Sequence, residues 1–206
     1  KNASQRWRIY EINVDGTGLK RISTGMGRTT CGWFYDNDRR VLYSSTFKAG
    51  ARCPTPPDMS KGYTWGLFDY DIYTSKPDGS DLKQLTTTPR YDAESVVSPD
   101  GKRVVFTSLR DGDLDMYTMN INGTDVRRVT NQLGYDGGAV WSPDGKQLAW
   151  RAFHPETDQE KADYQALIQQ NPDLRATLQG RTHDEIRAAV GVAEPALEGG
   201  FFPDTY

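Results

Sequence analysis

Three aspartates at alternate positions, Asp111, Asp113 and Asp115, form the most suggestive chemical motif in the sequence. Oxygen-rich spacing of this kind can hold Ca²⁺. An EF-hand loop would carry a glutamate at its twelfth position, and here that position is Asn122. The second and third aspartates also recur 44 residues earlier as Asp69 and Asp71. We therefore favour a structural turn over a metal site, and we predict no metal or other cofactor.

The sequence offers no clear arrangement for nucleophilic catalysis. His154 and His183 are the only histidines, and no Gly-x-Ser-x-Gly motif occurs. A Ser–His–Asp triad would need one of these histidines beside a serine held on a sharp turn. The glycine-rich segment 16–18 reads as a hairpin turn instead of a phosphate loop, because no helix follows it. These features predict that the chain is not an enzyme.

An internal repeat of 44 residues organises most of the chain. The segment SPDGK at 98–102 returns at 142–146, and the Tyr-Asp pair at 91–92 returns at 135–136. An earlier copy lies 63 residues upstream, since the Asp-Gly-Thr at 15–17 matches the Asp-Gly-Ser at 78–80. This distance of 63 residues exceeds the repeat length of 44, which predicts an insertion at about 48–67.

Each repeat predicts four short strands separated by Asp-Gly or Asn-Gly turns, which are strong hairpin signals. In the unit that starts at residue 91, the expected strands are 95–98, 103–108, 115–120 and 125–130. A four-stranded unit of this length is typical of a β-propeller blade, which must stack on its neighbours. The sequence starts at a third strand, holds two complete units and begins another. We predict an all-β fold, an incomplete β-propeller of about three four-stranded antiparallel blades over residues 1–153.

Three carboxylates precede the expected first strands of successive blades: Asp92, Glu94 and Asp136. The first strands of a propeller line its central axis, so these side chains could gather at the channel mouth and bind a cation or a basic peptide. The alternative is that they are solvated loop charges, and the sequence leaves both open.

Cys31 and Cys53 are the only cysteines. We predict a disulfide between them, because Cys53 lies in the insertion and a bond would tether it in an oxidising compartment. The alternative is two free thiols.

Residues 154–206 break the repeat and predict a short helical segment followed by an extended tail. Thr157 and Glu160 form a capping box that would start a helix. The end of the tail carries Phe201, Phe202 and Tyr206. Exposed aromatic residues at a chain end indicate docking on another protein. Packing of the same residues back on the blades is an equal alternative.

The recurring SPDGK turn, and the segment NGTDVRRVT that closes a unit at 122–130, resemble the TolB-type, WD-like β-propeller family. The similarity covers about residues 9–164 and includes the blade-closing Thr86 and Thr130. It implies a periplasmic or secreted bacterial protein whose propeller binds other proteins. The sequence departs from the family pattern after about Leu167, which favours a truncated propeller that serves as an accessory subunit.

Composition narrows the function further. The net charge is −3 with no basic stretch, which argues against nucleic-acid binding, and no apolar run is long enough to span a membrane. We predict a non-catalytic protein-binding or scaffolding module, an accessory subunit that docks on other protein subunits at the periplasmic side of a membrane complex. The alternatives are the propeller of a larger hydrolase of the prolyl-oligopeptidase type, and a Ca²⁺-dependent binding propeller.

Overall fold

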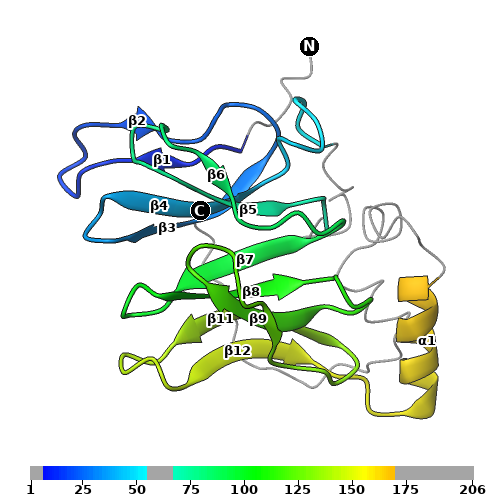
Figure 1. Cartoon of the computed structure of the whole chain (residues 1–206). Helices are drawn as coiled ribbons and strands as arrows, with labels where there is room; N and C mark the ends of the chain where they lie inside the picture. Colours follow the sequence, from blue (N-terminus) through cyan, green and yellow to red (C-terminus); the bar gives the residue numbers. More distant parts are fainter. Residues whose placement is uncertain (1–6, 55–66, 170–206) are drawn as a thin grey trace.

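The computed structural model describes residues 7–54 and 67–169, which fold into short antiparallel sheets stacked one on another (Figure 1). The strands are β1 (Tyr10–Glu11), β2 (Lys20–Arg21), β3 (Thr29–Tyr35), β4 (Arg40–Ser45), β5 (Asp71–Ser75), β6 (Lys83–Gln84), β7 (Asp92–Val97), β8 (Arg103–Ser108), β9 (Asp115–Asn120), β10 (Arg127–Arg128), β11 (Tyr135–Trp141) and β12 (Leu148–Phe153). The helix α1 covers Asp158–Gln169.

The strands form two complete blades and two half-blades. The complete blades are β3-β4-β5-β6 and β7-β8-β9-β10, and the half-blades are the pairs β1-β2 and β11-β12. In Figure 1 the half-blades lie at the top and the bottom of the stack, with the complete blades between them. The predicted all-β fold, an incomplete propeller of about three blades, is confirmed.

The same hydrogen bonds recur in each blade and show which strands are equivalent. The amide of Ile72, in β5, donates to the hydroxyl of Thr86 at 2.9 Å, and the amide of Met116, in β9, donates to Thr130 at 2.9 Å. At the start of the chain, the amide of Ile9 donates to Ser23 at 3.2 Å. The half-blade β1-β2 therefore holds the third and fourth strand positions of a blade.

Apolar side chains fill the space between successive blades. The cluster between the two complete blades contains Leu42, Ile72, Val97, Val104, Phe106, Tyr117 and Met119. A smaller cluster, with Val105, Met116 and Ala139, joins the second complete blade to β11. Each blade thus buries the apolar face of its neighbour, as stacked repeats must.

The inner strands begin earlier than the turn pattern predicts, and the outer strands are shorter. β7 starts at Asp92 instead of residue 95, and β10 contains only Arg127 and Arg128. The inner strands β3, β7 and β11 also each contain an irregular register that marks a β-bulge. Nothing in the turn pattern signals these bulges.

Helix α1 begins at the predicted capping box. The amide of Glu160 donates to the hydroxyl of Thr157 at 3.2 Å, and the amide of Thr157 donates to the Glu160 carboxylate at 2.9 Å. The helix follows β12 at the place where β9 follows β8 in the preceding blade (Figure 1). Within the described residues, no helix is long and apolar enough to cross a membrane.

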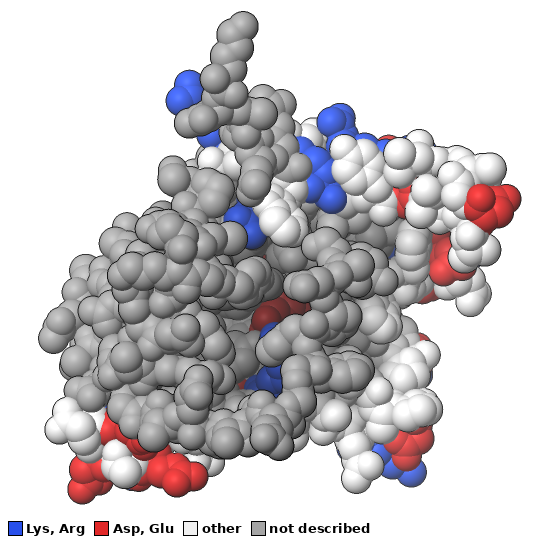
Figure 2. Space-filling model, turned by 180° about the vertical axis from the view of Figure 1, so that it is seen from behind, with Lys and Arg blue, Asp and Glu red and all other residues white. Residues whose placement is uncertain are grey.

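The predicted tail residues Phe201, Phe202 and Tyr206 lie outside the described residues, as do the other tail segments beyond residue 169. Seen from behind, the visible charged side chains of the described residues are of both signs, with an acidic group at the lower left (Figure 2).

Candidate functional site

The three predicted acidic residues of the inner strands are buried. Asp92 is 1% exposed, Glu94 is 9% exposed and Asp136 is 0% exposed. The interpretation as solvated loop charges is therefore wrong. The reason is that β7 and β11 start earlier than expected, which places these carboxylates inside the stacked strands. Each has its own set of protein partners.

Asp92 is held by Arg110, which follows the second strand of the same blade. The Arg110 guanidinium donates to both Asp92 oxygens, at 3.2 and 3.3 Å, and to the Ser108 hydroxyl at 2.9 Å. The same guanidinium lies over the rings of Phe106 and Tyr117, 5.1 and 4.8 Å from their centroids. Burial raises the pKa of Asp92, while the Ser108 hydroxyl and the Arg110 charge act in the opposite direction.

Asp136 occupies the equivalent position in the last half-blade but has different partners. One of its oxygens accepts a hydrogen bond from the Trp150 indole at 2.7 Å and contacts Nε2 of His154 at 3.1 Å. Its other oxygen is buried without a hydrogen-bond partner among the described residues. His154 stands 44 residues after Arg110, so this copy of the repeat has a histidine where the preceding copy has an arginine.

Glu94 links the second complete blade to β11. It has a left-handed backbone (φ 55°) at the bulge of β7 and accepts hydrogen bonds from the Thr107 hydroxyl at 2.8 Å and the Gly138 amide at 2.9 Å. A Cβ added at Gly137 would stand 2.4 Å from a Glu94 oxygen, so glycine is required for this close approach. The equivalent bulge residue of β3, Cys31, is also left-handed (φ 57°).

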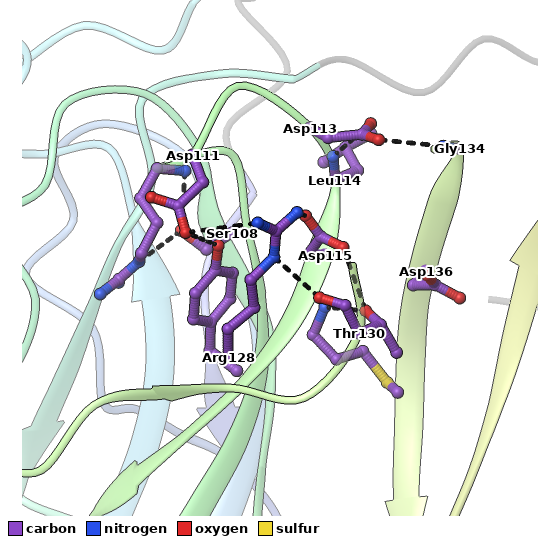
Figure 3. A network of polar contacts seen from close by, with 12 residues as sticks. Ser108, Asp111, Asp113, Leu114, Asp115, Arg128, Thr130, Gly134 and Asp136 are labelled. Atoms are coloured by element: carbon purple, nitrogen blue, oxygen red, sulfur yellow. Dashed lines mark hydrogen bonds and ion pairs between the residues drawn. The ribbon is translucent and has the colours of Figure 1, made fainter. Parts of the chain in front are cut away.

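Asp111, Asp113 and Asp115 belong to a network of polar contacts around β9, the third strand of the second complete blade (Figure 3). Asp111 accepts the Tyr117 hydroxyl at 2.6 Å, and Asp113 accepts the Gly134 amide at 2.9 Å. Asp115 forms an ion pair with Arg128.

The hydroxyl of Tyr164, in α1, donates to Asp113 and anchors the helix on this network. The proximity of Asp113, Asp115 and Asp136 adds to burial in raising the pKa of Tyr164. Every aspartate of the motif therefore has protein donors, as a structural turn requires. Among the described residues, no group of three or more His, Cys, Asp or Glu side chains is arranged to hold a metal ion.

The predicted disulfide is absent, which corrects the sequence-based expectation: Cys31 and Cys53 are free thiols. Each sulfur has a different neighbour. The Cys53 thiol donates to the carbonyl of Gly27 at 2.8 Å, and the Cys31 sulfur lies 3.4 Å from the Thr30 hydroxyl. Burial raises the pKa of the Cys31 thiol.

An open groove of about 1200 Å³ lies at the opposite end of the blades, between their turns. It is lined by Trp33, Phe34, Tyr35, Asp36, Asn37, Asp38, Arg40, Thr74, Lys83, Gln84, Leu85, Val96, Val97, Ser98, Pro99, Asp100, Gly101, Ile121, Asn122, Val140 and Trp141. Trp33 is 42% exposed and Val140 is 50% exposed. The repeat and turn patterns of the sequence do not predict this groove. Its only signal was the run Trp33-Phe34-Tyr35, which breaks the apolar–polar alternation of a half-buried strand.

The charges at the groove favour a cationic partner. Asp36 and Asp38 stand in the β3–β4 turn, and Asp38 is exposed. The lining cations Arg40 and Lys83 are both paired with Asp81, at 2.7 and 3.5 Å. The groove thus combines an exposed indole with carboxylates, an arrangement that can receive basic and apolar side chains.

A family model described as the TolB beta propeller domain matches residues 66–177, which is more than half of the chain. The chain therefore belongs to the TolB β-propeller family. No curated protein matches the sequence.

Several solved structures are similar in fold. TolB from Acinetobacter baumannii is 20% identical with a TM-score of 0.41, over 72% of this chain and 43% of that chain. The tricorn protease is 17% identical with a TM-score of 0.46, over 70% of this chain and 13% of that chain. An oligogalacturonate lyase in complex with manganese is 14% identical with a TM-score of 0.48, over 74% of this chain and 37% of that chain. The chain spans less than half the length of each of these proteins.

Proposed function

We propose that this TolB-family chain is a non-catalytic protein-binding module, and that the groove around Trp33 receives a segment of its partner. The observation that carries this proposal is an open groove that combines exposed side chains such as Trp33 and Val140 with carboxylates at its edge. The predicted acidic residues of the inner strands are buried and held by protein donors, so we place partner binding elsewhere.

The described residues favour binding over catalysis. His154 contacts Asp136, but no hydrogen bond joins this histidine to a serine or cysteine within the described part of the chain. The hydrogen bonds of His154 therefore do not include the histidine–nucleophile contact of a Ser–His–Asp hydrolase among the described residues.

We also propose that the module acts in the bacterial periplasm as an accessory subunit of a larger membrane complex. Membership of the TolB family supports this location. The aromatic tail residues Phe201, Phe202 and Tyr206 remain predicted contacts with the partner.

The proposal is tested by replacing Trp33 with Ser and comparing the proteins that co-purify from a periplasmic extract of the source. Val129→Ser is the matched control, because Val129 is 47% exposed and does not line the groove. We expect Trp33→Ser to lose the partner at least about tenfold, since buried aromatic anchors contribute about 2 kcal/mol or more to an interface. The control should retain the partner. Equal recovery with both variants would refute the role of the groove.

A further inference from the structure

The β9–β10 turn contains the only Asn-Gly pair of the sequence, Asn122-Gly123. Asn122 is exposed and lines the open groove around Trp33. An asparagine that precedes glycine is chemically labile, because glycine has no side chain to obstruct the attack of its own nitrogen on the asparagine amide. Asparagine is therefore one of the thermolabile residue types. The pair marks a place at the groove where the chain can change its own charge.

Packing between the blades requires the glycine of this pair. Gly123 has a left-handed backbone (φ 87°), and a Cβ added to it would stand 2.7 Å from the carbonyl oxygen of Leu85 in the preceding blade. The equivalent Gly79 has φ 81°, and a Cβ added there would stand 2.9 Å from the carbonyl oxygen of Ile22. The close approach of the two backbones thus fixes the glycine, and only the residue before it can vary.

The residue before the glycine is an aspartate in the two equivalent turns. In all three turns its side-chain oxygen accepts the amide of the residue two positions later, at 2.9 to 3.2 Å, and the hydroxyl of that residue, at 2.6 to 2.7 Å. The pairs are Asn122 with Thr124, Asp78 with Ser80, and Asp15 with Thr17. The hydroxyl and the amide lower the pKa of both aspartates. This turn therefore accommodates a charged carboxylate where Asn122 has an amide.

We propose that Asn122 is a site of spontaneous deamidation that adds a negative charge to the groove. The Gly123 nitrogen loses its proton to solvent and forms a bond to the side-chain carbonyl carbon of Asn122. The bond from that carbon to the side-chain nitrogen breaks, and ammonia leaves with a proton taken from solvent. Water then opens the five-membered ring. The net change is the hydrolysis of one amide to a carboxylate and ammonium.

The folded turn slows this reaction without preventing it. The Gly123 amide donates to the carbonyl of Asn120 at 2.9 Å, so the turn must open before the Gly123 nitrogen can attack. Opening disturbs little structure, because β10 contains only Arg127 and Arg128 and both are exposed. We therefore expect Asn122 to react in the folded protein, and to react faster when the chain is unfolded.

The added carboxylate changes the groove in the direction that a basic partner favours, a consequence that rests on the proposed function. The lining already carries Asp36, Asp38 and Asp100, and its two cations are both paired with Asp81. One further carboxylate at Asn122 increases the attraction of the groove for a basic segment. Deamidation should therefore tighten partner binding as the protein ages.

The modification is tested by incubating the folded chain in mildly alkaline buffer and mapping its tryptic peptides by mass spectrometry. Trypsin releases residues 111–127 as one peptide, which contains both Asn122 and Asn120. Asn120 is the internal control, because the β-branched side chain of Ile121 obstructs the same attack. A sample taken before incubation corrects for deamidation during digestion.

We expect Asn122 to acquire the mass of the acid several-fold faster than Asn120. Equal rates at the two positions overturn the proposal, as does an unchanged Asn122 in the folded protein. Asn122→Asp supplies the product directly, and its urea midpoint of unfolding should equal that of the wild type. A lower midpoint would show that the turn rejects the carboxylate, contrary to its two equivalents.

The effect on the groove is measured with the proteins that Trp33→Ser fails to recover from the periplasmic extract. Asn122→Asp should recover more of them than the wild type does. Asn131→Asp is the matched control, because it adds the same charge at an exposed position outside the groove lining, and it should change nothing. Equal recovery with both variants refutes the effect on binding. If Trp33→Ser loses no protein, the proposed function fails, whereas the peptide map still decides whether Asn122 is modified.

Discussion

Asp71 is a half-buried carboxylate without a cationic partner among its hydrogen bonds, whereas its equivalent in the next blade has one. Its carboxylate accepts hydrogen bonds from the Gln84 amide at 2.9 Å and the Tyr73 hydroxyl at 3.3 Å. Burial, together with the nearby Asp92, raises the pKa of Asp71 from 3.8 to about 6. The equivalent residue 44 positions later, Asp115, has Arg128 where Asp71 has Gln84.

The raised pKa makes a signed prediction about stability. The unfolded chain releases the Asp71 proton near its ordinary pKa, while the folded chain holds it until about pH 6. Between these values the folded state binds more protons, so the free energy of unfolding falls as pH rises. A difference of about two units at about 1.4 kcal/mol each would give about 3 kcal/mol for a fully buried group. Asp71 is only half-buried, so solvent screening reduces this to about 1–2 kcal/mol.

Replacing Asp71 with Asn removes this dependence, because the amide does not titrate. Urea unfolding of both proteins is measured at several values between about pH 4 and pH 7. We expect the wild type to lose about 1–2 kcal/mol relative to Asp71→Asn across that range. The reverse design is the single replacement Gln84→Arg, which supplies a cation like the one beside Asp115 and should reduce the loss.

Asp78→Asn is the control for pH effects unrelated to burial. Asp78 is fully solvated, and the Ser80 hydroxyl lowers the pKa of its carboxyl. Its contribution to stability therefore has the opposite sign and decreases as pH falls. A difference between wild type and Asp71→Asn that stays flat within about 0.5 kcal/mol would refute the reasoning.

Three other predictions follow from the buried contacts. Thr130→Val should lower the free energy of unfolding by about 1–3 kcal/mol in urea melts, because it leaves a buried amide without an acceptor; an unchanged midpoint would contradict this. Arg110→Ala should cost about 3–5 kcal/mol, because it leaves the Asp92 charge buried and unpaired; a loss below about 1 kcal/mol would show that water replaces the guanidinium. A thiol-reactive reagent should label two thiols per chain, Cys31 and Cys53, in protein unfolded without reductant. Labelling of neither cysteine would show that the two form a disulfide after all.

The sequence predicted the blades well because their turns are local. Asp-Gly and Asn-Gly pairs at a constant spacing mark hairpins whatever the rest of the chain does. The capping box of α1 is local in the same way. The predicted structural role of the Asp113 and Asp115 pair agrees with their contacts, because the repeat already identified both residues as recurring blade landmarks.

Contacts between distant segments were not predictable in this way. Asp92 is paired with Arg110, just after the neighbouring strand, and Asp136 is paired with Trp150, on the neighbouring strand. Comparison of equivalent repeat positions could have indicated that His154 replaces Arg110. The disulfide was predicted from an insertion that needed tethering, whereas the Cys53 sulfur instead satisfies a backbone carbonyl.

The left-handed bulge residues Cys31 and Glu94 make different contacts at successive boundaries between blades. At the bulge of β7 the Glu94 carboxylate accepts the Gly138 amide of the next strand pair at 2.9 Å, and charge-assisted bonds are roughly twice as strong as neutral ones. At the bulge of β3 the equivalent residue is Cys31, which supplies a thiol in place of a carboxylate. The boundary between the two complete blades relies instead on the larger apolar cluster around Leu42, Ile72 and Val97. One boundary between blades is therefore held chiefly by apolar packing, and the next is held in addition by a directional, charge-assisted hydrogen bond.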